Sequence, residues 1–498
     1  MKRFSVLIGA GVSVIGVLLL AFFLIDRGYF SSNRTNDRFT DLVMYHVYLP
    51  AFFDGDRKNN TASVDKEGRY GDGDLQGLIQ KMDHIRSLGM NAIFMSPPFR
   101  SHSAHGYDVL DYFSIGEHVG VPGDPAASLE LFRKTVSEAH AHGLKLILDL
   151  PLNHVYKDYR FPEGDPHGFK PKFTDAETFE EKNWQNAGNN LAYWDLSDKK
   201  TREFLIDVAL NWVDEGVDGL RLDYVAGVPV DFWRELYAAV KARKANLYVI
   251  GEVWPDRADG DENRRRIAEF YAREEGVQFD SLFEIPFALA VRNAFAKGGS
   301  LVPVEETLER SEKLYPQGSL PAYFFESHDI TRFMDWTGDY RRFVAATGLM
   351  AGLSGPQSFF YGGEAGLRGS VVKEGFTPTG RIPMRFDDAT ERNAKLISAI
   401  YAARAESAAL RSGTRHSILA EDRALIMEKR SATDTAFVGV NLDEKERIFS
   451  FRVGTSTSSA SLRSLFGSSS FSADKEGTLT WKLPPVSTSI IGGPRRTP

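Results

Sequence analysis

The sequence predicts an α/β fold in which a barrel of parallel strands is followed by an antiparallel β domain. From about residue 40 to residue 400, apolar runs of strand length alternate with stretches of helical spacing, and this alternation is typical of a parallel sheet. Polar side chains directly follow several of these strands, which is where an α/β barrel builds its active site. From about residue 412, short alternating runs such as RALIMEKR and TAFVGVNL indicate antiparallel strands.

The first part of the predicted barrel contains three strands and two helices. The strands are LVMYHVYL, NAIFMSP and LKLILDL. The first helix carries apolar residues at helical spacing, namely Leu75, Leu78, Ile79, Met82 and Ile85. The second helix is expected to open at Asp124-Pro125, because proline is favoured in the first helical turn, and to end at Gly143.

After His154 the alternation stops until about Ala192. The intervening segment is rich in glycine, proline, asparagine and aromatic residues. Structureless loops of that length are uncommon in compact domains, so the segment predicts a small subdomain inserted over the mouth of the barrel. Alternation then resumes, and the strands DGLRLDYV, NLYVIGE, VQFDSLFEI, AYFFES and PQSFFYGG bring the predicted number to eight.

The composition limits the classes of function. With 498 residues, of which 42% are hydrophobic and 26% charged, the chain is long enough for a large core and two or three domains. A formal net charge of -7, without a basic run that includes aromatic residues, argues against nucleic acid as a partner and suits a neutral substrate. The chain has no cysteine, which excludes disulfides, thiolate metal sites and a cysteine nucleophile.

An almost unbroken apolar run from about Phe4 to Ile25 follows Lys2 and Arg3. Its length is close to the roughly 20 residues that a helix needs to cross a bilayer. The run is long for a removed signal peptide and lacks a small-residue cleavage site, so an uncleaved anchor is favoured over secretion after cleavage. Positive charge before the run keeps the N-terminus in the cytoplasm, and residues 1–30 are therefore expected to anchor a catalytic region that lies outside it.

One predicted strand carries two opposite charges on the same face. Arg221 and Asp223 are two residues apart in DGLRLDYV, so their side chains point the same way. Burial of such charges is costly unless they pair, and a purely structural ion pair explains this strand as well as a catalytic one does. Other strand ends favour catalysis, because they also carry polar side chains: Asp149, Asn153, His154, Glu252, His328 and Asp329.

Three carboxylates, one arginine and two histidines at strand ends are the groups that a retaining glycosidase needs. One carboxylate attacks the sugar, and a second, about 5–5.5 Å away, protonates the leaving oxygen. Asp223 is the better nucleophile, because the nearby cation of Arg221 favours its ionised form. Glu252 ends an apolar strand and faces other carboxylates, so its pKa is expected to be raised, as a proton donor requires.

Four segments and their order resemble the α-amylase family of glycoside hydrolases, which includes amylases, cyclomaltodextrinases and cyclodextrin glycosyltransferases. The segments are DLPLNH (149–154), GLRLD (219–223), GEVW (251–254) and FFESHD (324–329), and HGYDVLDY and YGGEAGL extend the match. The resemblance covers about residues 40–490. It implies a (β/α)8 TIM barrel over 38–405, a small inserted domain B over 155–195, and a C-terminal antiparallel β-sandwich, domain C, over 412–494.

The resemblance implies a role for each residue of the site. Asp223 is the expected nucleophile, Glu252 the general acid and base, and Asp329 the third carboxylate, which binds and distorts the sugar at the cleavage point. Substrate-binding residues are expected at Tyr107, His154, Arg221 and His328, with the Tyr107 ring beneath the sugar. Arg332 is expected either to pair with a carboxylate or to lie on the surface. Four loop aromatics are expected to stack on sugars or to pack in the core: Trp184, Tyr193, Trp194 and Trp254.

The loop DGDRKNN carries hard oxygen ligands of the kind that calcium prefers. From the residues alone, a solvated loop with Asx turns is the simpler interpretation. The loop also resembles the calcium loop of cyclodextrin glycosyltransferases and related amylases. This resemblance implies Ca²⁺ bound by Asp54, Asp56, Asn59, Asn60 and Asp74, with a backbone oxygen near Asp72. A second calcium site at Asn153 and Asp195, as in many amylases, is a weaker expectation.

The sequence departs from the family pattern close to the nucleophile. Ala226 stands where many amylases carry a lysine that touches the sugar on the leaving side. Gly227 stands where they carry a histidine whose backbone oxygen binds calcium, an oxygen that a glycine can also supply. Ser327 stands where asparagine is common. Product size, acceptor preference and subfamily therefore stay open.

The expected activity is hydrolysis of α-1,4-glucosidic bonds in starch, glycogen or maltooligosaccharides through a covalent glycosyl-aspartate intermediate. The first alternative is a glucanotransferase, which the calcium loop favours and the presence of one β domain after the barrel disfavours. The second alternative is a non-catalytic subunit of an amino-acid transporter, because such subunits also combine a membrane helix with an amylase-like domain. This alternative is disfavoured, since all three carboxylates are present and cysteine is absent.

Overall fold

The computed structural model describes residues 39–57, 72–159, 172–186, 190–254, 261–272, 274, 276–369, 380–453, 461–474 and 476–494. The apolar run from Phe4 to Ile25 lies outside these residues, so the membrane anchor stays a prediction. Among the described residues, no helix combines the length and the apolar character needed to cross a membrane.

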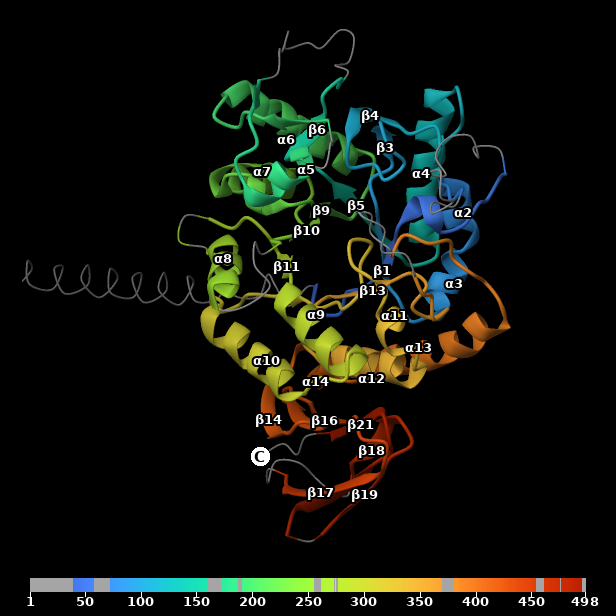
Figure 1. Ribbon diagram of the computed structural model, residues 1–498, viewed down its shortest axis with the longest axis vertical. Coiled ribbons are helices and arrows are strands. Elements are labelled where there is room, and N and C mark those ends of the chain that lie inside the picture. Colours follow the sequence, from blue (N-terminus) through green and yellow to red (C-terminus); the bar gives the residue numbers. More distant parts are fainter. Residues whose placement is uncertain are drawn as a thin grey trace, which may run out of the picture.

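A sheet of eight parallel strands forms the centre of the described chain (Figure 1). In chain order its strands are β1 (Val43–Val47), β2 (Ala92–Met95), β5 (Lys145–Leu150), β9 (Gly219–Leu222), β10 (Tyr248–Gly251), β11 (Ser281–Phe283), β12 (Pro321–Ala322) and β13 (Gln357–Phe360). Each strand pairs with the next one along the sheet, and β13 pairs with β1. A parallel bridge between Tyr323 and Gln357 joins the two ends of the sheet. The barrel predicted from the sequence is confirmed.

Helices pack around this sheet (Figure 1). They are α2 (Leu75–Gln80), α3 (Met82–Ser87), α4 (Pro125–Ala141), α6 (Lys199–Asp214), α7 (Val230–Arg243), α8 (Asp261–Tyr271), α9 (Ile285–Val291), α10 (Val302–Leu314), α11 (Phe333–Thr337), α12 (Tyr340–Ala351), α13 (Asp388–Glu406) and α14 (Ala408–Ser412). The single helix predicted from Leu75 to Ile85 is instead two, because Lys81 (φ −110°, ψ 9°) leaves the helical region between α2 and α3. Helix α4 begins as predicted, with Asp124 as its cap and Pro125 in its first turn.

The side chains of the barrel strands alternate between two apolar clusters, as the two-residue period of a strand requires. One set packs against the surrounding helices and includes Tyr45, Ile93 and Leu148. The other set fills the interior and includes Met44, Phe94 and Ile147. The interior is therefore a packed core and not a channel.

A small antiparallel sheet follows β5 and lies beyond the C-terminal ends of β5 and β9. Its strand order is β6 (His154–Tyr156), β8 (Leu191–Trp194) and β7 (Phe173–Thr174), with helix α5 (Phe179–Asn186) between β7 and β8 in the chain. A hairpin of β3 (Phe99–Ser101) and β4 (Val109–Ile115) contacts it, and Tyr112 of β4 donates a hydrogen bond to the carbonyl of Pro151 at 2.6 Å. We call this sheet with α5 domain B. The domain limits given from the sequence stay predictions.

Two antiparallel sheets form the C-terminal region, which we call domain C (Figure 1). The larger sheet has the order β14 (Thr414–Ala420), β15 (Ala424–Arg430), β16 (Asp434–Asn441), β21 (Ser487–Pro494), β18 (Arg463–Phe466), and the smaller sheet has the order β17 (Arg447–Arg452), β20 (Thr478–Leu483), β19 (Ser470–Ala473). Side chains from both sheets share one apolar cluster, which includes Phe437, Leu479 and Trp481. The predicted antiparallel sandwich is confirmed.

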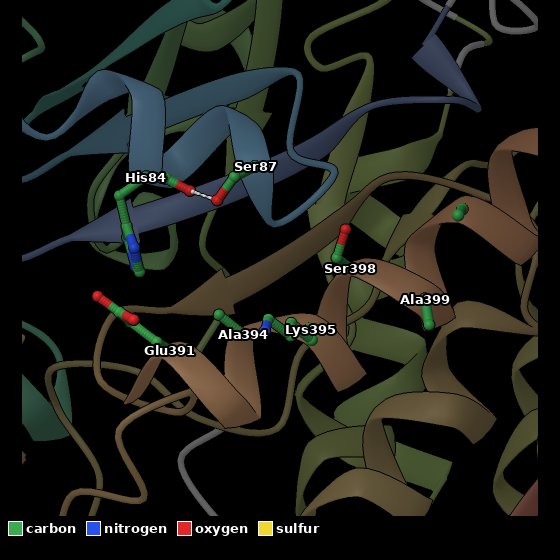
Figure 2. A pocket seen from close by; sticks show the side chains of 8 residues that line it. His84, Ser87, Glu391, Ala394, Lys395, Ser398 and Ala399 are labelled. Carbon is green, nitrogen blue, oxygen red and sulfur yellow. Dashed lines mark hydrogen bonds between the residues drawn. The ribbon is translucent and has the colours of Figure 1, made fainter. Parts of the chain in front are cut away.

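A hollow of about 540 Å³ lies on the outer wall of the barrel between α3 and α13 (Figure 2). It is lined by His84, Ser87, Glu391, Ala394, Lys395, Ser398, Ala399 and Ala402. None of the residues that the sequence predicted to be catalytic or ligand-binding is among them. The hollow is therefore separate from the site at the ends of the barrel strands.

Candidate active site

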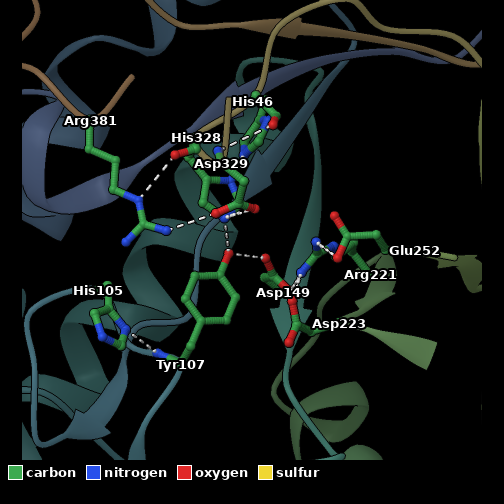
Figure 3. Close-up of polar contacts among 11 residues, drawn as sticks. His46, His105, Tyr107, Asp149, Arg221, Asp223, Glu252, His328, Asp329 and Arg381 are labelled. Atoms are coloured by element: carbon green, nitrogen blue, oxygen red, sulfur yellow. Dashed lines mark hydrogen bonds and ion pairs between the residues drawn. The ribbon is translucent and has the colours of Figure 1, made fainter. Parts of the chain in front are cut away.

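The polar side chains predicted to form the site meet at the C-terminal ends of the barrel strands (Figure 3). They are, in chain order, Asp149 in β5, Arg221 in β9, Asp223 after β9, Glu252 after β10, and His328 and Asp329 after β12. Parallel strands of a barrel all end at the same face, and this brings residues together that are far apart in the sequence.

The guanidinium group of Arg221 joins three carboxyl groups. Its Nη1 atom donates to Asp149 Oδ1 and to Asp223 Oδ1, at 2.7 Å in each case. Its Nη2 atom lies 2.8 Å from Glu252 Oε2. Although burial opposes the charged form, these carboxyl groups hold the pKa of Arg221 well above its ordinary value. A planar cation with several fixed donors suits such a junction, which a lysine ammonium group cannot reproduce.

Two of these carboxyl groups have raised pKa values. Burial, opposed in part by Arg221, raises the pKa of Glu252 to about 8, and the charges of Asp223 and Asp329 add to the rise. Burial also raises the pKa of Asp149 to about 7, again against the effect of Arg221. Glu252 therefore carries a proton at neutral pH, as a general acid must.

His328 and Asp329 form the opposite side of the site. His328 Nε2 lies 2.9 Å from Asp329 Oδ2, and Arg381 Nη2 donates to Asp329 Oδ1 at 2.8 Å. Burial alone would raise the pKa of Asp329, but the interactions with His328 and Arg381 outweigh it and hold this pKa well below its ordinary range. Asp329 is therefore ionised at the pH at which Glu252 is protonated, and this difference separates the roles of the two groups.

Tyr107 links the two sides of the site. Its hydroxyl donates to Asp149 Oδ2 at 2.8 Å and lies 2.6 Å from His328 Nε2. His328 Nδ1 lies 3.1 Å from His46 Nε2, so both ring nitrogens of His328 have a hydrogen-bond partner. The Tyr107 and His328 rings are stacked, with 5.3 Å between centroids. The position of Tyr107 beneath a bound sugar stays a prediction.

His154 lies beside the aromatic side chains of domain B. Its ring centroid is 5.4 Å from that of Trp184 and 6.0 Å from that of Tyr193. Burial lowers the pKa of His154, and a neutral imidazole offers one donor and one acceptor to sugar hydroxyls. Tyr193 and Trp194 are buried at 2% and 3% exposure, which makes them core residues, whereas Trp184 and Trp254 are half-buried and keep an accessible face.

Three residues of the site were not predicted from the sequence. His46 of β1 contacts His328, and His105 accepts a hydrogen bond from the backbone N–H of Tyr107 at 3.1 Å. Arg381 binds Asp329 from 52 residues farther along the chain, so no local pattern connects the two. For His46 a signal was available, because it is the one ionisable imidazole in the apolar run LVMYHVYL.

Arg332 is 1% exposed, so the alternative that it lies on the surface is wrong. It lies 3.8 Å from Glu326 and donates hydrogen bonds to the carbonyls of Gly380 and Tyr361. Its guanidinium group also lies over the Phe360 ring. Arg332 therefore pairs with a carboxylate outside the catalytic group and holds the segments that follow β12 and β13.

Three of the predicted calcium ligands lie together at the start of α2. Carboxylate oxygens of Asp54, Asp56 and Asp74 all lie within 4.8 Å of one another. Asp74 is 1% exposed and accepts hydrogen bonds from the N–H groups of Gly55 and Gly77, which makes it the cap of α2. Burial, to which Asp56 and Asp54 add, raises the pKa of Asp74 to about 6 against these hydrogen bonds.

This chemistry fits a hard divalent cation. Asp54 and Asp56 of the loop and Asp74 at the start of α2 bring three carboxylates together, and an oxygen-ligated ion such as Ca²⁺ offsets their mutual repulsion. Asp72 is described but does not belong to the group of three, and Asn59 and Asn60 lie outside the described residues.

Comparison with known proteins decides the family. A sequence model of the family described as alpha amylase, catalytic domain, matches residues 46–407. The chain is a member of the α-amylase family. It is therefore an α-amylase-type glycosidase, and the alternative of a non-catalytic transporter subunit is not supported.

Named relatives of this α-amylase family enzyme include two bacterial hydrolases. The cyclomaltodextrinase of Thermoanaerobacter pseudethanolicus is 28% identical over 82% of this chain and 71% of that protein. Neopullulanase 2 of Thermoactinomyces vulgaris is 30% identical over 70% of this chain and 59% of that protein.

Solved structures share the whole described fold. An Anoxybacillus α-amylase superposes with a TM-score of 0.77 at 27% identity, over 92% of this chain and 99% of that one. CldA, a cyclomaltodextrin glucanotransferase with a three-domain ABC distribution, superposes with a TM-score of 0.74 at 22% identity, over 91% and 99%. The second likeness concerns the fold alone.

Proposed function

We propose that this enzyme hydrolyses α-1,4-glucosidic bonds in starch, glycogen or maltooligosaccharides with retention of configuration. The observation that carries the proposal is the contact of one guanidinium group, that of Arg221, with both Asp223 and Glu252. Two carboxyl groups that share a guanidinium lie close together. A retaining glycosidase needs a separation of about 5–5.5 Å, whereas an inverting one needs roughly 6.5–9.5 Å.

Asp223 is the nucleophile of the first step. Its carboxylate attacks the anomeric carbon, and the bond from that carbon to the leaving oxygen breaks as the new bond forms. Arg221 Nη1 donates to Asp223 Oδ1 at 2.7 Å and so orients the carboxylate that attacks. The product of this step is a glycosyl ester of Asp223.

Glu252 is the proton donor of the first step and the proton acceptor of the second. Its pKa, raised to about 8, keeps it protonated at neutral pH, so it can protonate the leaving oxygen. The resulting carboxylate then takes a proton from the water that hydrolyses the ester. Two displacements at one carbon restore the original configuration.

Asp329, His328 and His154 bind the sugar at the cleavage point. The ionised Asp329 carboxylate accepts hydrogen bonds from sugar hydroxyls, and the neutral imidazoles donate or accept according to their tautomers. The half-buried rings of Trp184 and Trp254 offer faces for further sugar units. An α-glucan substrate agrees with the names of the related cyclomaltodextrinase and neopullulanase.

Incubation of the purified full-length chain with maltoheptaose tests this proposal. Wild type is expected to release short linear maltooligosaccharides, and the new reducing ends are expected to be α when read by NMR straight after cleavage. Asp223→Asn removes the nucleophile and is expected to abolish product, whereas Asp83→Asn, at an exposed helix position, is the matched control. Products of β configuration would contradict the assignment of a retaining mechanism.

A glucanotransferase is the second candidate function. It forms the same glycosyl ester but passes the sugar to a hydroxyl group of another glucan. The three-domain glucanotransferase has the same fold, so one β domain after the barrel is no argument against transfer. Products longer than maltoheptaose, or cyclic ones, would favour this candidate over hydrolysis.

We also propose that the enzyme binds Ca²⁺ at Asp54, Asp56 and Asp74, a group of acidic side chains that supports this choice. Asn59, Asn60 and a backbone oxygen near Asp72 are the further ligands expected from the sequence. When bound, the ion would supply the positive charge that offsets the repulsion among these three carboxylates. This loop packs against the start of α2, so the effect of the ion is expected on stability.

We propose, finally, that the apolar run from Phe4 to Ile25 anchors the enzyme in a membrane with the barrel outside the cytoplasm. The length of the run and the preceding positive charges support this proposal. Mass measurement of the protein extracted from membranes tests it. Loss of roughly the first 30 residues would contradict the anchor and show that the run is a cleaved signal segment of a secreted enzyme.

A further inference from the structure

Helix α5 of domain B begins with a reciprocal pair of hydrogen bonds. Thr178 Oγ1 accepts from the N–H of Glu181 at 3.2 Å, and Glu181 Oε2 accepts from the N–H of Thr178 at 2.9 Å. The same oxygen accepts from the N–H of Glu177 at 2.8 Å. This is a capping box, in which two side chains satisfy the backbone groups that a helix leaves unpaired at its start.

The other oxygen of Glu181 reaches the barrel. Glu181 Oε1 accepts a hydrogen bond from Asn153 Nδ2 at 3.0 Å, and Asn153 lies directly before His154 at the end of β5. The Glu181 residue is 3% exposed, yet its carboxylate has donors from the backbone and from a side chain. A buried carboxylate with several donors stabilises a contact, whereas an unpaired one would be costly.

Gly227 leaves the space that this contact needs. A Cβ atom at this position would lie 2.6 Å from Glu181 Oε1 and 2.8 Å from Asn153 Oδ1, closer than atoms of these types approach. Gly227 is one of the positions close to the nucleophile at which this chain departs from the common family pattern. The absence of a side chain at residue 227 therefore makes room for the Glu181 carboxylate.

Tyr224 connects the same helix to the nucleophile. It follows Asp223 directly and has a left-handed backbone at φ 38°, a conformation that costs energy for any residue other than glycine. Its hydroxyl donates to Thr178 Oγ1 at 3.0 Å, and its ring centroid lies 4.8 Å from that of Trp184. The strained turn after the nucleophile is thus held by side chains of domain B.

The second calcium site expected at Asn153 and Asp195 does not fit these contacts. Asn153 donates through Nδ2 to Glu181 Oε1 at 3.0 Å, so its NH2 group and not its ligand oxygen makes this contact. Asp195 Oδ1 accepts from the N–H and the hydroxyl of Ser197, at 3.0 and 2.5 Å. Within the described residues, no group of three acidic or imidazole ligands forms around these two positions.

We propose that Glu181 is a positioning residue that docks domain B onto the barrel through direct hydrogen bonds, in place of a second calcium ion, and so fixes the turn that carries Asp223. The kinetic part of this proposal rests on Asp223 being the nucleophile. The docking and metal parts are independent of that role, so their tests remain informative if no turnover is found.

Glu181→Gln in the full-length chain is the first test. Glutamine has nearly the same size but one acceptor, so it cannot serve both the N–H groups of α5 and Asn153. We expect kcat on maltoheptaose to fall on the order of tenfold to a hundredfold with a smaller change in KM, since displacement of a reacting group lowers the rate of the chemical step. Limited proteolysis within residues 155–195 is expected to become faster.

Glu177→Gln is the matched control, because Glu177 is the exposed neighbour whose side chain makes none of the contacts described above. It is expected to leave kcat and the proteolysis pattern unchanged. A Glu181→Gln enzyme with the kcat and the proteolysis pattern of wild type would overturn the proposal.

A double variant separates the contact from general damage to the fold. Asn153→Asp alone places two carboxylates against each other and is expected to lower the melting temperature. Combined with Glu181→Gln, it restores one donor and one acceptor and is expected to recover part of kcat and of protease resistance. A double variant whose losses are the sum of the two single losses would contradict a direct contact.

The claim that no calcium ion binds at Glu181 is tested by the calcium content of a variant that lacks the site at Asp54, Asp56 and Asp74. In Asp54→Asn/Asp56→Asn we expect elemental analysis after dialysis against calcium to find none bound to the chain. Calcium that persists in this variant and disappears when Glu181→Gln is added would show that Glu181 is a metal ligand, and the proposal would fall.

Discussion

Glu252 Oε2 lies 2.8 Å from Arg221 Nη2, and yet the pKa of Glu252 is raised to about 8. A cation at that distance alone favours the ionised carboxylate. Burial outweighs it, and the negative charges of Asp223 and Asp329 add to the effect of burial. The site thus holds a carboxyl group with a raised pKa beside the arginine that also contacts Asp223.

This relationship predicts the alkaline side of the pH profile. Because Glu252 must be protonated for the first step, kcat/KM is expected to fall as the pH rises through about 8. Glu252→Gln cannot donate a proton and is expected to lower kcat on maltoheptaose by roughly 10²- to 10⁴-fold. Initial rates across pH 5 to about 10 measure the first effect, and an alkaline limit well below 7 would contradict it.

A substrate that needs no acid provides the control for Glu252→Gln. Fluoride leaves without protonation, so cleavage of an α-glucosyl fluoride is expected to retain most of its rate in this variant. An equal loss of rate on both substrates would indicate that the substitution damages the site as a whole and does not only remove a proton donor.

Arg381 is expected to control the acid side of the profile through Asp329. The interactions with Arg381 and His328 hold the pKa of Asp329 well below its ordinary range, against the effect of burial. Arg381→Gln removes a positive charge, so this pKa rises and more of the carboxylate is protonated at acid pH. We expect kcat/KM to fall about tenfold and its acid limit to move to higher pH, as read from the pH dependence of initial rates.

Arg385→Gln is the comparison for Arg381→Gln, because Arg385 lies four residues away and its guanidinium group donates to the carbonyl of Ala365 and not to Asp329. It is expected to keep the acid limit of wild type. An Arg381→Gln enzyme with an unmoved acid limit would mean that Asp329 does not determine it.

The sequence predicts that Asp223, Glu252 and Asp329 meet at one end of the barrel (Figure 3), because each follows an apolar run and the ends of parallel strands lie together. It does not predict Arg381, which reaches Asp329 from a segment beyond the last barrel strand. His46 and Glu181 also escape prediction, although each leaves a signal: an imidazole in an apolar strand, and a T-x-x-E pattern before α5. These signals are weak because a single histidine or a capping pattern more often has a purely structural role.

The fold, like the site, is predicted only in part from the sequence. The count of eight strands follows from the alternation of apolar runs, and it is confirmed. The limits of the elements depend on tertiary contacts. AYFFES predicts a strand of several residues, but β12 covers Pro321–Ala322 and only a bridge at Tyr323 continues its pairing. Helix α2 ends at Gln80 although the apolar spacing continues, since that spacing contains no information about the backbone of Lys81.

Asp74→Asn is expected to remove the stabilisation of the enzyme by calcium. Asparagine caps a helix about as well as aspartate, so the substitution removes charge and leaves α2 capped. Calcium at a hundredfold excess over its Kd is expected to raise the free energy of unfolding of wild type by about 2.7 kcal/mol. Thermal melts in calcium and in chelator measure the difference for wild type, Asp74→Asn and the control Asp83→Asn, whose side chain is 93% exposed.

The pH dependence of the chelated enzyme follows from the same group. Burial raises the pKa of Asp74 from 3.8 to about 6. The contribution of such a group to stability is fully present below its unfolded pKa and is lost as the pH rises through its folded pKa. Chelation is therefore expected to lower the melting temperature more at pH 7 than at pH 5, and a shift that is equal at both would contradict the link to Asp74.

Lys429 of β15 is a buried lysine that faces the barrel from domain C. It is 2% exposed, and its Nζ atom donates to Ser354 Oγ at 2.7 Å. Burial lowers the pKa of Lys429 to about 7, and the charges of Arg404 and Arg415 lower it further, against the effect of Glu312. Folding therefore disfavours the ammonium form that an unfolded lysine keeps at neutral pH.

Lys429→Met is expected to stabilise the enzyme. Methionine has a similar length and no charge, and Ser354 keeps its own hydrogen bond to the carbonyl of Gly413, so no polar group is left unpaired. We expect the free energy of unfolding to rise by about 1 kcal/mol or more at pH 7. Denaturant unfolding of Lys429→Met and of the exposed control Lys445→Met measures this, with less than about 0.5 kcal/mol expected for the control.

The sign of the pH effect provides the decisive comparison for Lys429. With a folded pKa of about 7 and an ordinary value of 10.5, the unfolded state binds more protons than the folded state between these values. The stability of wild type therefore rises with pH across this window, because the unfolded lysine gives up the proton that favoured it. The advantage of Lys429→Met is expected to be largest near pH 7 and to shrink toward pH 10. An advantage that does not change with pH would assign the stabilisation to packing and not to the buried charge.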